Sequence, residues 1–280
     1  MSQEGYGLFL KICDLYLVLF QVTIFLVVWD IFYRPERERK ALLPIGVFAA
    51  ANVLLRLCPG VPGWVRYAVS AADVLGYCYL KYKRHLEKAV FTLLLFYNFH
   101  GMSFLASNSI YQFMMDSMLS RLDVRDAEYM SRMYICNMFG QGCNILFYTF
   151  SFILMVLIMK KVVKDPTPMN WHDVMFLSAL NVVGSMLTWM VMDISVIQID
   201  KEIFFLFDQR KEMIWKVPLI AALLCSGEMS AVYIFRKYKE LLREREKHFV
   251  EEQQMKAMKR RLEEAENFYG RHLLFFHEMV

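Results

Sequence analysis

Long apolar segments, separated by short charged or proline-containing stretches, dominate the pattern along this chain. A helix needs about 20 mostly apolar residues to cross the hydrocarbon core of a bilayer. The segments that approach this length cover residues 8–32, 41–57, 64–80, 89–110, 133–159, 171–199 and 215–235. We therefore predict an all-α, polytopic membrane protein of about seven transmembrane helices. Because the second and third segments are the shortest, six spans is the main alternative.

The connecting segments predict an orientation. Lys and Arg are dense in the connections 34–40, 81–85 and 160–164 and in the tail after residue 235, whereas the turn at 59–63 has none. The connections 112–132 and 200–214 mix acids with bases, and we expect the first to be an extramembrane loop with a short amphipathic helix. Basic residues of short loops collect on the cytoplasmic side. We therefore expect the N-terminus outside the cell and the C-terminus in the cytoplasm.

Composition supports the membrane assignment. The chain is 57% hydrophobic, has 12 Gly and 7 Pro in 280 residues, and has a mean hydropathy of +0.32. Its net charge of +4 is clustered in loops and near the C-terminus, which indicates membrane orientation and no nucleic-acid partner. The six cysteines form no CxxC pair or zinc-like spacing, so we expect no metal site, disulfide or cofactor. The first segment has no basic start or cleavage site, so we expect it to remain as a span.

The sequence from 236 to 270 changes character. Lys, Arg and Glu dominate without Gly or Pro, which favours one continuous helix. A heptad-like seam runs through Tyr238, Leu241, His248, Met255, Met258, Leu262, Ala265 and Tyr269. Glu244 and Glu251 interrupt it, and Leu242 and Phe249 form a competing seam. We predict a cytoplasmic dimerisation and signalling helix that forms a weak parallel coiled coil, with a single solvated helix as the alternative.

Ionisable residues inside predicted spans are expensive and suggest function. Asp73, Asp193 and Glu228 are candidates for signal coupling, Glu228 above all, because its span leads directly into the charged helix. The alternative is that they join helices by hydrogen bonds worth roughly 0.6–2 kcal/mol each. Further hydrogen-bonding side chains in the spans are Asn52, Asn98, His100, Asn108, Gln141, Asn144 and Asn181.

An extracellular ligand site is predicted around the two mixed loops. Apolar side chains suited to a peptide or another apolar ligand are Tyr111, Phe113, Met114, Met115, Phe204, Phe205 and Phe207. Aromatic residues also collect at membrane interfaces, so the alternative is that these side chains anchor the helices in the bilayer.

Residues 251–270, with the sequence EEQQMKAMKRRLEEAENFYG, carry a family resemblance. They resemble the linker before the phosphoacceptor box of bacterial GHKL-type sensor histidine kinases, relatives of the accessory-gene-regulator quorum-sensing receptor. His277, Glu278 and Met279 match the middle of that box, whereas Phe276 and Val280 replace its arginine and lysine. In that family a multi-span membrane domain detects an extracellular signal, often a peptide, and a dimerising helix leads to the box and the ATP-binding domain.

The resemblance implies a multi-pass protein of the bacterial plasma membrane that belongs to a two-component system. Residues 1–235 are then its transmembrane sensor domain, and 271–280 are a remnant of the phosphoacceptor box, with His277 as a vestigial acceptor beside Glu278. We expect a homodimer that responds to an extracellular peptide or small molecule. Phosphoryl transfer needs Mg²⁺ and a nucleotide cradle. Residues 1–280 encode no P-loop, Gly-rich lid or acidic metal cluster, so we expect a truncated chain with no kinase activity by itself.

Two other classes of function remain open. A small multi-span transporter or permease component would have Gly- or Pro-broken helices in matching halves, and both residues are sparse in these spans. An intramembrane enzyme would carry an HExxH motif or paired aspartates at membrane depth, and the sequence has neither.

Overall fold

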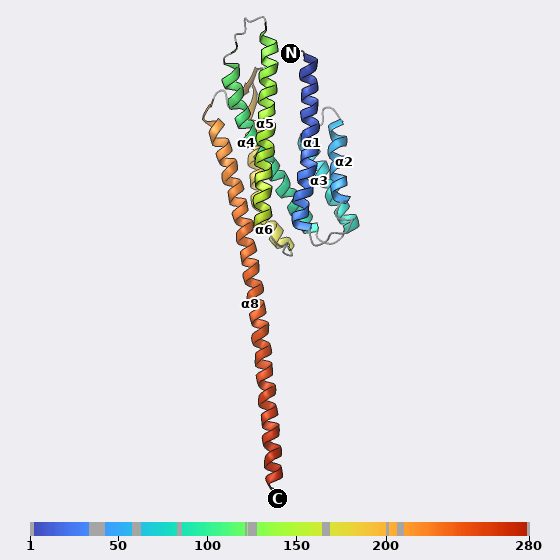
Figure 1. The fold of residues 1–280 in the computed structure, drawn as a ribbon, viewed down its shortest axis with the longest axis vertical. Helices are drawn as coiled ribbons and strands as arrows, with labels where there is room; N and C mark the ends of the chain where they lie inside the picture. Colours follow the sequence, from blue (N-terminus) through green and yellow to red (C-terminus); the bar gives the residue numbers. More distant parts are fainter. Residues whose placement is uncertain are drawn as a thin grey trace. The chain divides into compact units, whose positions relative to one another are not determined.

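The computed structural model describes residues 3–33, 43–57, 63–82, 86–120, 122, 128–163, 169–199, 202–205 and 210–278, without the side chains of 33, 56–57, 63–64, 81–82, 192–205 and 267–278. Its elements are α1 (Gln3–Tyr33), α2 (Leu43–Leu57), α3 (Gly63–Tyr77), the π-helical η3 (Cys78–Tyr82), α4 (Leu86–Leu119), α5 (Tyr129–Val162), α6 (Trp171–Ser195), β1 (Val196–Ile199), β2 (Glu202–Phe205) and α8 (Met213–Glu278) (Figure 1). The chain forms two compact units, Met1–Val232 and Tyr233–Val280, so α8 contributes to both.

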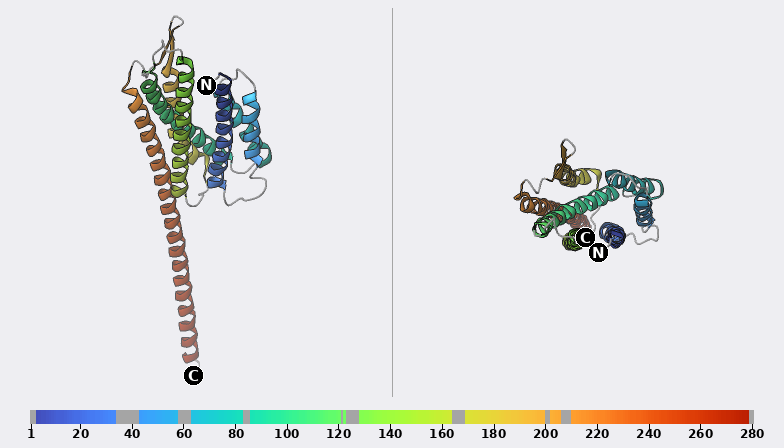
Figure 2. Two further views of the ribbon diagram at one scale, coloured as in Figure 1. Left: turned by 45° about the horizontal axis from the view of Figure 1, so that its top comes forward. Right: turned by 90° about the horizontal axis from the view of Figure 1, so that it is seen from above.

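In the first unit, helices that follow one another run in opposite directions (Figure 1). Seen from above, α4 crosses the middle of the bundle, with α6 on one side and α1 and α5 on the other (Figure 2). Aromatic rings hold α1, α2 and α4 together: Phe25 stacks on Phe48 with ring centroids 4.1 Å apart, and Phe96 meets both rings edge-on. The shorter α2 and α3 pack against each other at one flank of the bundle, where α2 contacts α1 and α3 contacts α4 (Figure 2).

This unit is apolar outside and partly polar inside. On α5, Leu146 and Phe150 are 69% and 65% exposed, whereas Asn98 and Glu228 are 0% and 3% exposed. A soluble protein buries its large apolar residues and keeps charged ones in water. In lipid the apolar surface needs no cover, whereas polar groups need partners inside the bundle. The surface is therefore suited to contact with a lipid bilayer.

Five of the described helices are long and apolar enough to cross a membrane: α1, α4, α5, α6 and α8. The helices α2 and α3 have 15 residues each. At 1.5 Å per residue that is about 22 Å, less than the roughly 30 Å of a bilayer core. A helical, multi-pass membrane protein is thus supported, whereas the seven predicted spans remain a proposal.

The span expected at 171–199 was too long. Helix α6 ends at Ser195, and Val196–Ile199 is strand β1, which pairs antiparallel with β2 so that Val196 faces Phe205. The segment is rich in β-branched residues, which favour strands. An apolar run cannot by itself distinguish a strand from a continued helix. The regular elements of the described residues are therefore helices apart from this short hairpin.

The connection at 112–132 also differs from the expectation. Helix α4 continues to Leu119 and α5 begins at Tyr129, so regular helix replaces much of the loop and its predicted separate amphipathic helix. No Gly or Pro lies between Gly101 and Gly140. The sequence therefore holds no residue that strongly opposes helix in this stretch.

In the second unit, every residue from 243 to 266 is exposed. The predicted seam includes Leu241 at 54% exposure, Met258 at 71% and Leu262 at 62%. Ion pairs one turn apart line the helix, such as Arg236 with Glu240 at 3.1 Å and Lys256 with Glu252 at 2.7 Å. The coiled coil, the homodimer and the predicted domain boundary at 235 stay predictions. Tyr269, the last predicted seam residue, lies outside the described side chains.

Candidate functional site

A buried polar contact joins α4, α6 and α8. The side-chain amide of Asn98 on α4 donates hydrogen bonds to Glu228 Oε1 on α8 and, at 3.3 Å, to Asn181 Oδ1 on α6. Asn181 in turn donates to the carbonyl of Leu177 on its own helix. All three side chains are at most 3% exposed. We call Asn98, Asn181 and Glu228 the Glu228 cluster; through it a single amide links three helices.

The Glu228 cluster is short of hydrogen-bond donors. Glu228 Oε2 and Asn98 Oδ1 are buried and have no hydrogen-bond partner among the described residues. None of the ion pairs in the described part of the chain involves Glu228. A buried carboxylate without a counter-charge is costly, as is a buried acceptor without a donor. The cluster is therefore only partly satisfied.

Close packing of α6 against α4 fixes the position of Asn98. A Cβ atom added to Gly184 would lie 2.5 Å from Asn98 Oδ1 and 2.8 Å from Met102 Cε. One turn away, a Cβ on Gly101 would lie 2.8 Å from Thr188 Cγ2. Small residues let helix backbones approach closely in membranes. Gly184 thus provides the space that the Asn98 side chain occupies.

A second polar cluster lies two residues further along α4. His100 Nε2 and Nδ1 are each 2.5 Å from a tyrosine hydroxyl, Tyr67 on α3 and Tyr148 on α5 respectively. The Tyr148 and Phe152 rings pack around the imidazole. One hydroxyl donates to the ring nitrogen that lacks a proton and the other accepts from the N–H, so both nitrogens are partnered whichever tautomer is present. We call Tyr67, His100 and Tyr148 the His100 cluster.

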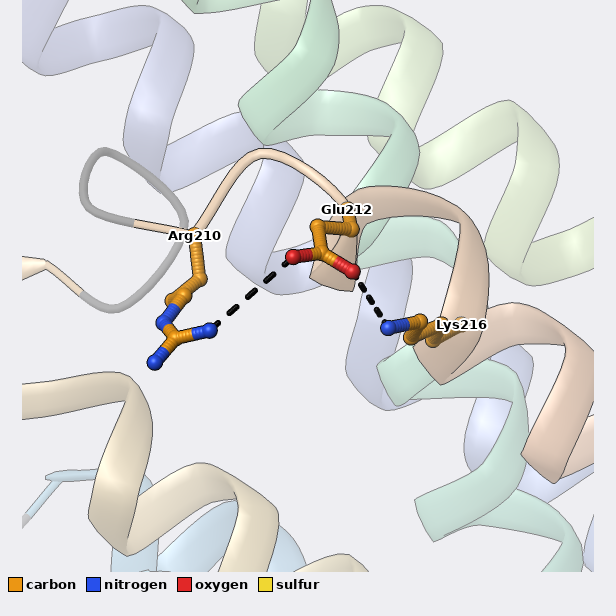
Figure 3. A network of polar contacts seen from close by, with 3 residues as sticks. All are labelled: Arg210, Glu212 and Lys216. Carbon is orange, nitrogen blue, oxygen red and sulfur yellow. Dashed lines mark hydrogen bonds and ion pairs between the residues drawn. The ribbon is translucent and has the colours of Figure 1, made fainter.

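At the start of α8, charged residues connect it to the end of α4. Lys211 Nζ lies 3.0 Å from Asp116 Oδ2. Glu212 lies between Arg210 at 3.9 Å and Lys216 at 2.5 Å, as Figure 3 shows. The hydrogen bond and the charge of Lys216 lower the pKa of Glu212. All of these charged groups are exposed, so each pair contributes little to stability.

The predicted ligand residues are only partly brought together. Phe113 is 46% exposed, and its ring centroid lies 5.6 Å from that of the exposed Trp215. Met115 is buried near Gly140, and the Tyr111 hydroxyl donates to Asn137 Oδ1 at 3.3 Å. Met114 is half-buried on α4, and Phe204, Phe205 and Phe207 lie outside the described side chains. Phe113 and Trp215 thus form an exposed aromatic pair between α4 and α8.

The remaining predicted site residues are scattered. Asp73 is exposed on α3 and does not belong to either cluster. The side chains of Asp193, His277 and Glu278 lie outside the described ones. Among the residues described, no three His, Cys, Asp or Glu side chains lie close enough together to hold a metal ion. Of the coupling candidates, Glu228 alone is shown in a buried contact between helices.

Sequence reasoning singled out Glu228 but not its partners. Asn98, Asn181 and His100 were recognised only as polar residues within apolar helices, which is the available signal. Which helix each of them faces depends on packing. Gly184 had no signal at all, because a glycine that makes room for a side chain looks in sequence like any other.

Comparison of the chain with protein-family models, with curated proteins and with solved structures found no match in any of the three.

Proposed function

We propose that this chain is the membrane-embedded sensing and signal-transmitting region of a bacterial two-component sensor histidine kinase of the GHKL type. One observation supports this above all. Glu228 is held inside the bundle by α4, and the helix that carries it, α8, runs on to Glu278 through the segment that resembles the kinase linker. A buried contact and an output segment on one helix are what signal transmission requires.

The transmission step follows from this arrangement. A stimulus that shifts α4 changes the position in which the Asn98 amide meets the Glu228 carboxylate. Because a helix keeps its backbone hydrogen bonds, a rotation of residues 213–232 is passed to the residues that follow. In the proposed receptor, that rotation alters how the two linker helices of a homodimer pair through their exposed apolar residues, among them Met255, Met258 and Leu262.

The signal enters at the outer end of the bundle. There Phe113 and Trp215 offer exposed rings next to Arg210, Lys211 and Glu212. Such a surface suits an extracellular peptide or small molecule with apolar and charged groups. In this proposal the N-terminus lies outside, α8 enters the cytoplasm, and α2 and α3 complete seven crossings of the bacterial plasma membrane.

A chimera tests the proposal. Residues 1–270 are fused to the phosphoacceptor and ATP-binding regions of an intact GHKL-type kinase and reconstituted in nanodiscs. Basal autophosphorylation is then measured for the parent chimera, for Glu228→Ala and for Ser230→Ala. Ser230 is an exposed neighbour on α8 whose hydroxyl donates to the Ser226 carbonyl of the same helix, so it is a matched control. We expect a several-fold change for Glu228→Ala and none for Ser230→Ala; equal rates in all three would contradict the coupling role.

Cysteine cross-linking tests the homodimer separately. Met258→Cys should cross-link between two copies of the full chain in nanodiscs, because it lies on the exposed seam. Lys256→Cys, on another face of the same helix turn, is the control. Equal cross-linking at both positions would argue against a defined seam.

A further inference from the structure

The Glu228 cluster has more buried oxygen atoms than hydrogen-bond donors to satisfy them. Asn98 uses its amide group on Asn181 and on Glu228 Oε1. That leaves Glu228 Oε2 and Asn98 Oδ1 without donors, although Asn98 is fully buried and Glu228 is 3% exposed. On α6, one turn before Asn181, Ser178 Oγ is also buried without a partner among the described residues. These unpaired oxygen atoms need a hydrogen-bond donor or a cation.

The groups that face Glu228 carry no compensating charge. Helix α4 presents Asn98, and α6 presents Asn181, neither of which ionises. On α8 itself the titratable neighbour in electrostatic contact is Cys225, whose thiolate would add negative charge. Glu228 forms no ion pair in the described part of the chain. A single ionised carboxylate would therefore stand uncompensated inside an apolar bundle, which is strongly unfavourable.

We propose that the Glu228 cluster binds one monovalent cation, either a proton or Na⁺, on the Glu228 carboxylate. A proton on Oε2 turns this acceptor into a donor, and a turn of the Asn98 amide places Oδ1 where it accepts that hydrogen bond. For Na⁺, the carboxylate and amide oxygens of the cluster are suitable hard ligands. Either ion supplies the positive charge that the Glu228 carboxylate lacks. This inference does not depend on the kinase-sensor role proposed above.

Occupancy would change the link between α4 and α8. In the structure the Asn98 amide donates to the carboxylate. With the cation bound, the carboxylate no longer needs that donor, and the amide oxygen of Asn98 takes part instead. The ion thus alters the same contact that joins the two helices.

The test measures the ion dependence of stability for the full chain in nanodiscs. Thermal unfolding is followed while pH is varied in choline chloride, and while Na⁺ replaces choline at fixed pH and ionic strength. A ligand that binds the folded state raises Tm as its concentration rises. We expect the Tm of the wild type to rise with acidity or with Na⁺, and the first result identifies the proton and the second Na⁺. Glu228→Gln should lose that response, and Glu252→Gln, which removes an exposed carboxylate, should keep it.

A second variant keeps the test decisive if Glu228→Gln does not fold. Asn98→Ala removes the donor that favours the ionised carboxylate, so a proton site should respond at higher pH. It also removes an amide oxygen, so a Na⁺ site should need several-fold more Na⁺. The proposal is overturned if Glu228→Gln and the wild type respond identically, or if the Asn98→Ala midpoint does not move.

Discussion

Two buried polar clusters lie two residues apart on α4, and they differ in how completely their atoms are paired. In the His100 cluster both ring nitrogens have a tyrosine hydroxyl at 2.5 Å. In the Glu228 cluster an oxygen of Glu228 and one of Asn98 are unpaired. A fully satisfied buried network fixes one arrangement, whereas a partly satisfied one has alternatives of similar free energy. The first therefore serves to hold α3, α4 and α5, and the second is where α4 and α8 can change their contact.

The largest effect is expected when His100, the centre of the fully paired cluster, is removed. His100→Ala deletes both hydrogen bonds and leaves a space among packed rings, so we expect the folded bundle to lose about 3 kcal/mol or more. Tyr148→Phe removes one hydroxyl and should cost about 1 kcal/mol. Denaturant unfolding in bicelles measures both. A loss below that of Tyr148→Phe would show that His100 is not structural.

The second-largest loss of stability is expected when the close packing of α6 against Asn98 is disturbed. In Gly184→Ala the new methyl group meets the Asn98 amide, so we expect a destabilisation of about 2 kcal/mol and an altered response of the chimera. Gly142→Ala on α5 is the matched control, since no atom lies within 4 Å of its Cβ. The control should be neutral or slightly stabilising, as alanine favours helix. Equal effects of the two variants on unfolding would refute the close approach.

A smaller effect of opposite sign is expected beside the Glu228 cluster. Ser178 Oγ is buried without a partner, so Ser178→Ala removes an unsatisfied hydroxyl and should be neutral or stabilise by up to about 1 kcal/mol. Thr92→Val is the contrast, because Thr92 Oγ1 donates to the Lys88 carbonyl at 2.7 Å. The same unfolding assay should find Thr92→Val the less stable of the two. The reverse order would mean that Ser178 has a partner in the membrane.

The smallest effect on stability is expected for the exposed contact between Glu212 and Lys216, which contrasts with the two buried clusters. The pKa of Glu212 is lowered in the folded protein, first by its hydrogen bond from Lys216. This contribution is present above the unfolded pKa and is lost as pH falls through the folded pKa. The Tm of the wild type should thus slightly exceed that of Glu212→Gln at neutral pH, and the difference should vanish in acid. A difference that grows in acid would have the wrong sign.

The helical membrane bundle could be predicted from the sequence because the length and hydropathy of each apolar segment can be read directly from it. The prediction was wrong at 196–199, where an apolar, β-branched run forms a strand, and the predicted loop before Tyr129 was too long. It also identified Glu228, because an acid in an apolar helix stands out. Its pairing with Asn98 and Asn181 depends on how three helices rotate against one another. One sequence carries no local signal for that rotation.

The account depends on α8 carrying a rotation from the Glu228 cluster to the linker, and alanine insertion tests this most directly. Each alanine inserted between Phe235 and Arg236 of the chimera turns the following helix by about 100°. We predict that basal autophosphorylation changes most with two insertions, about 200° of turn, and returns toward the parent value with four, which complete about one full turn. Activity that is unaffected by insertion, or that declines steadily with its length, would contradict the account.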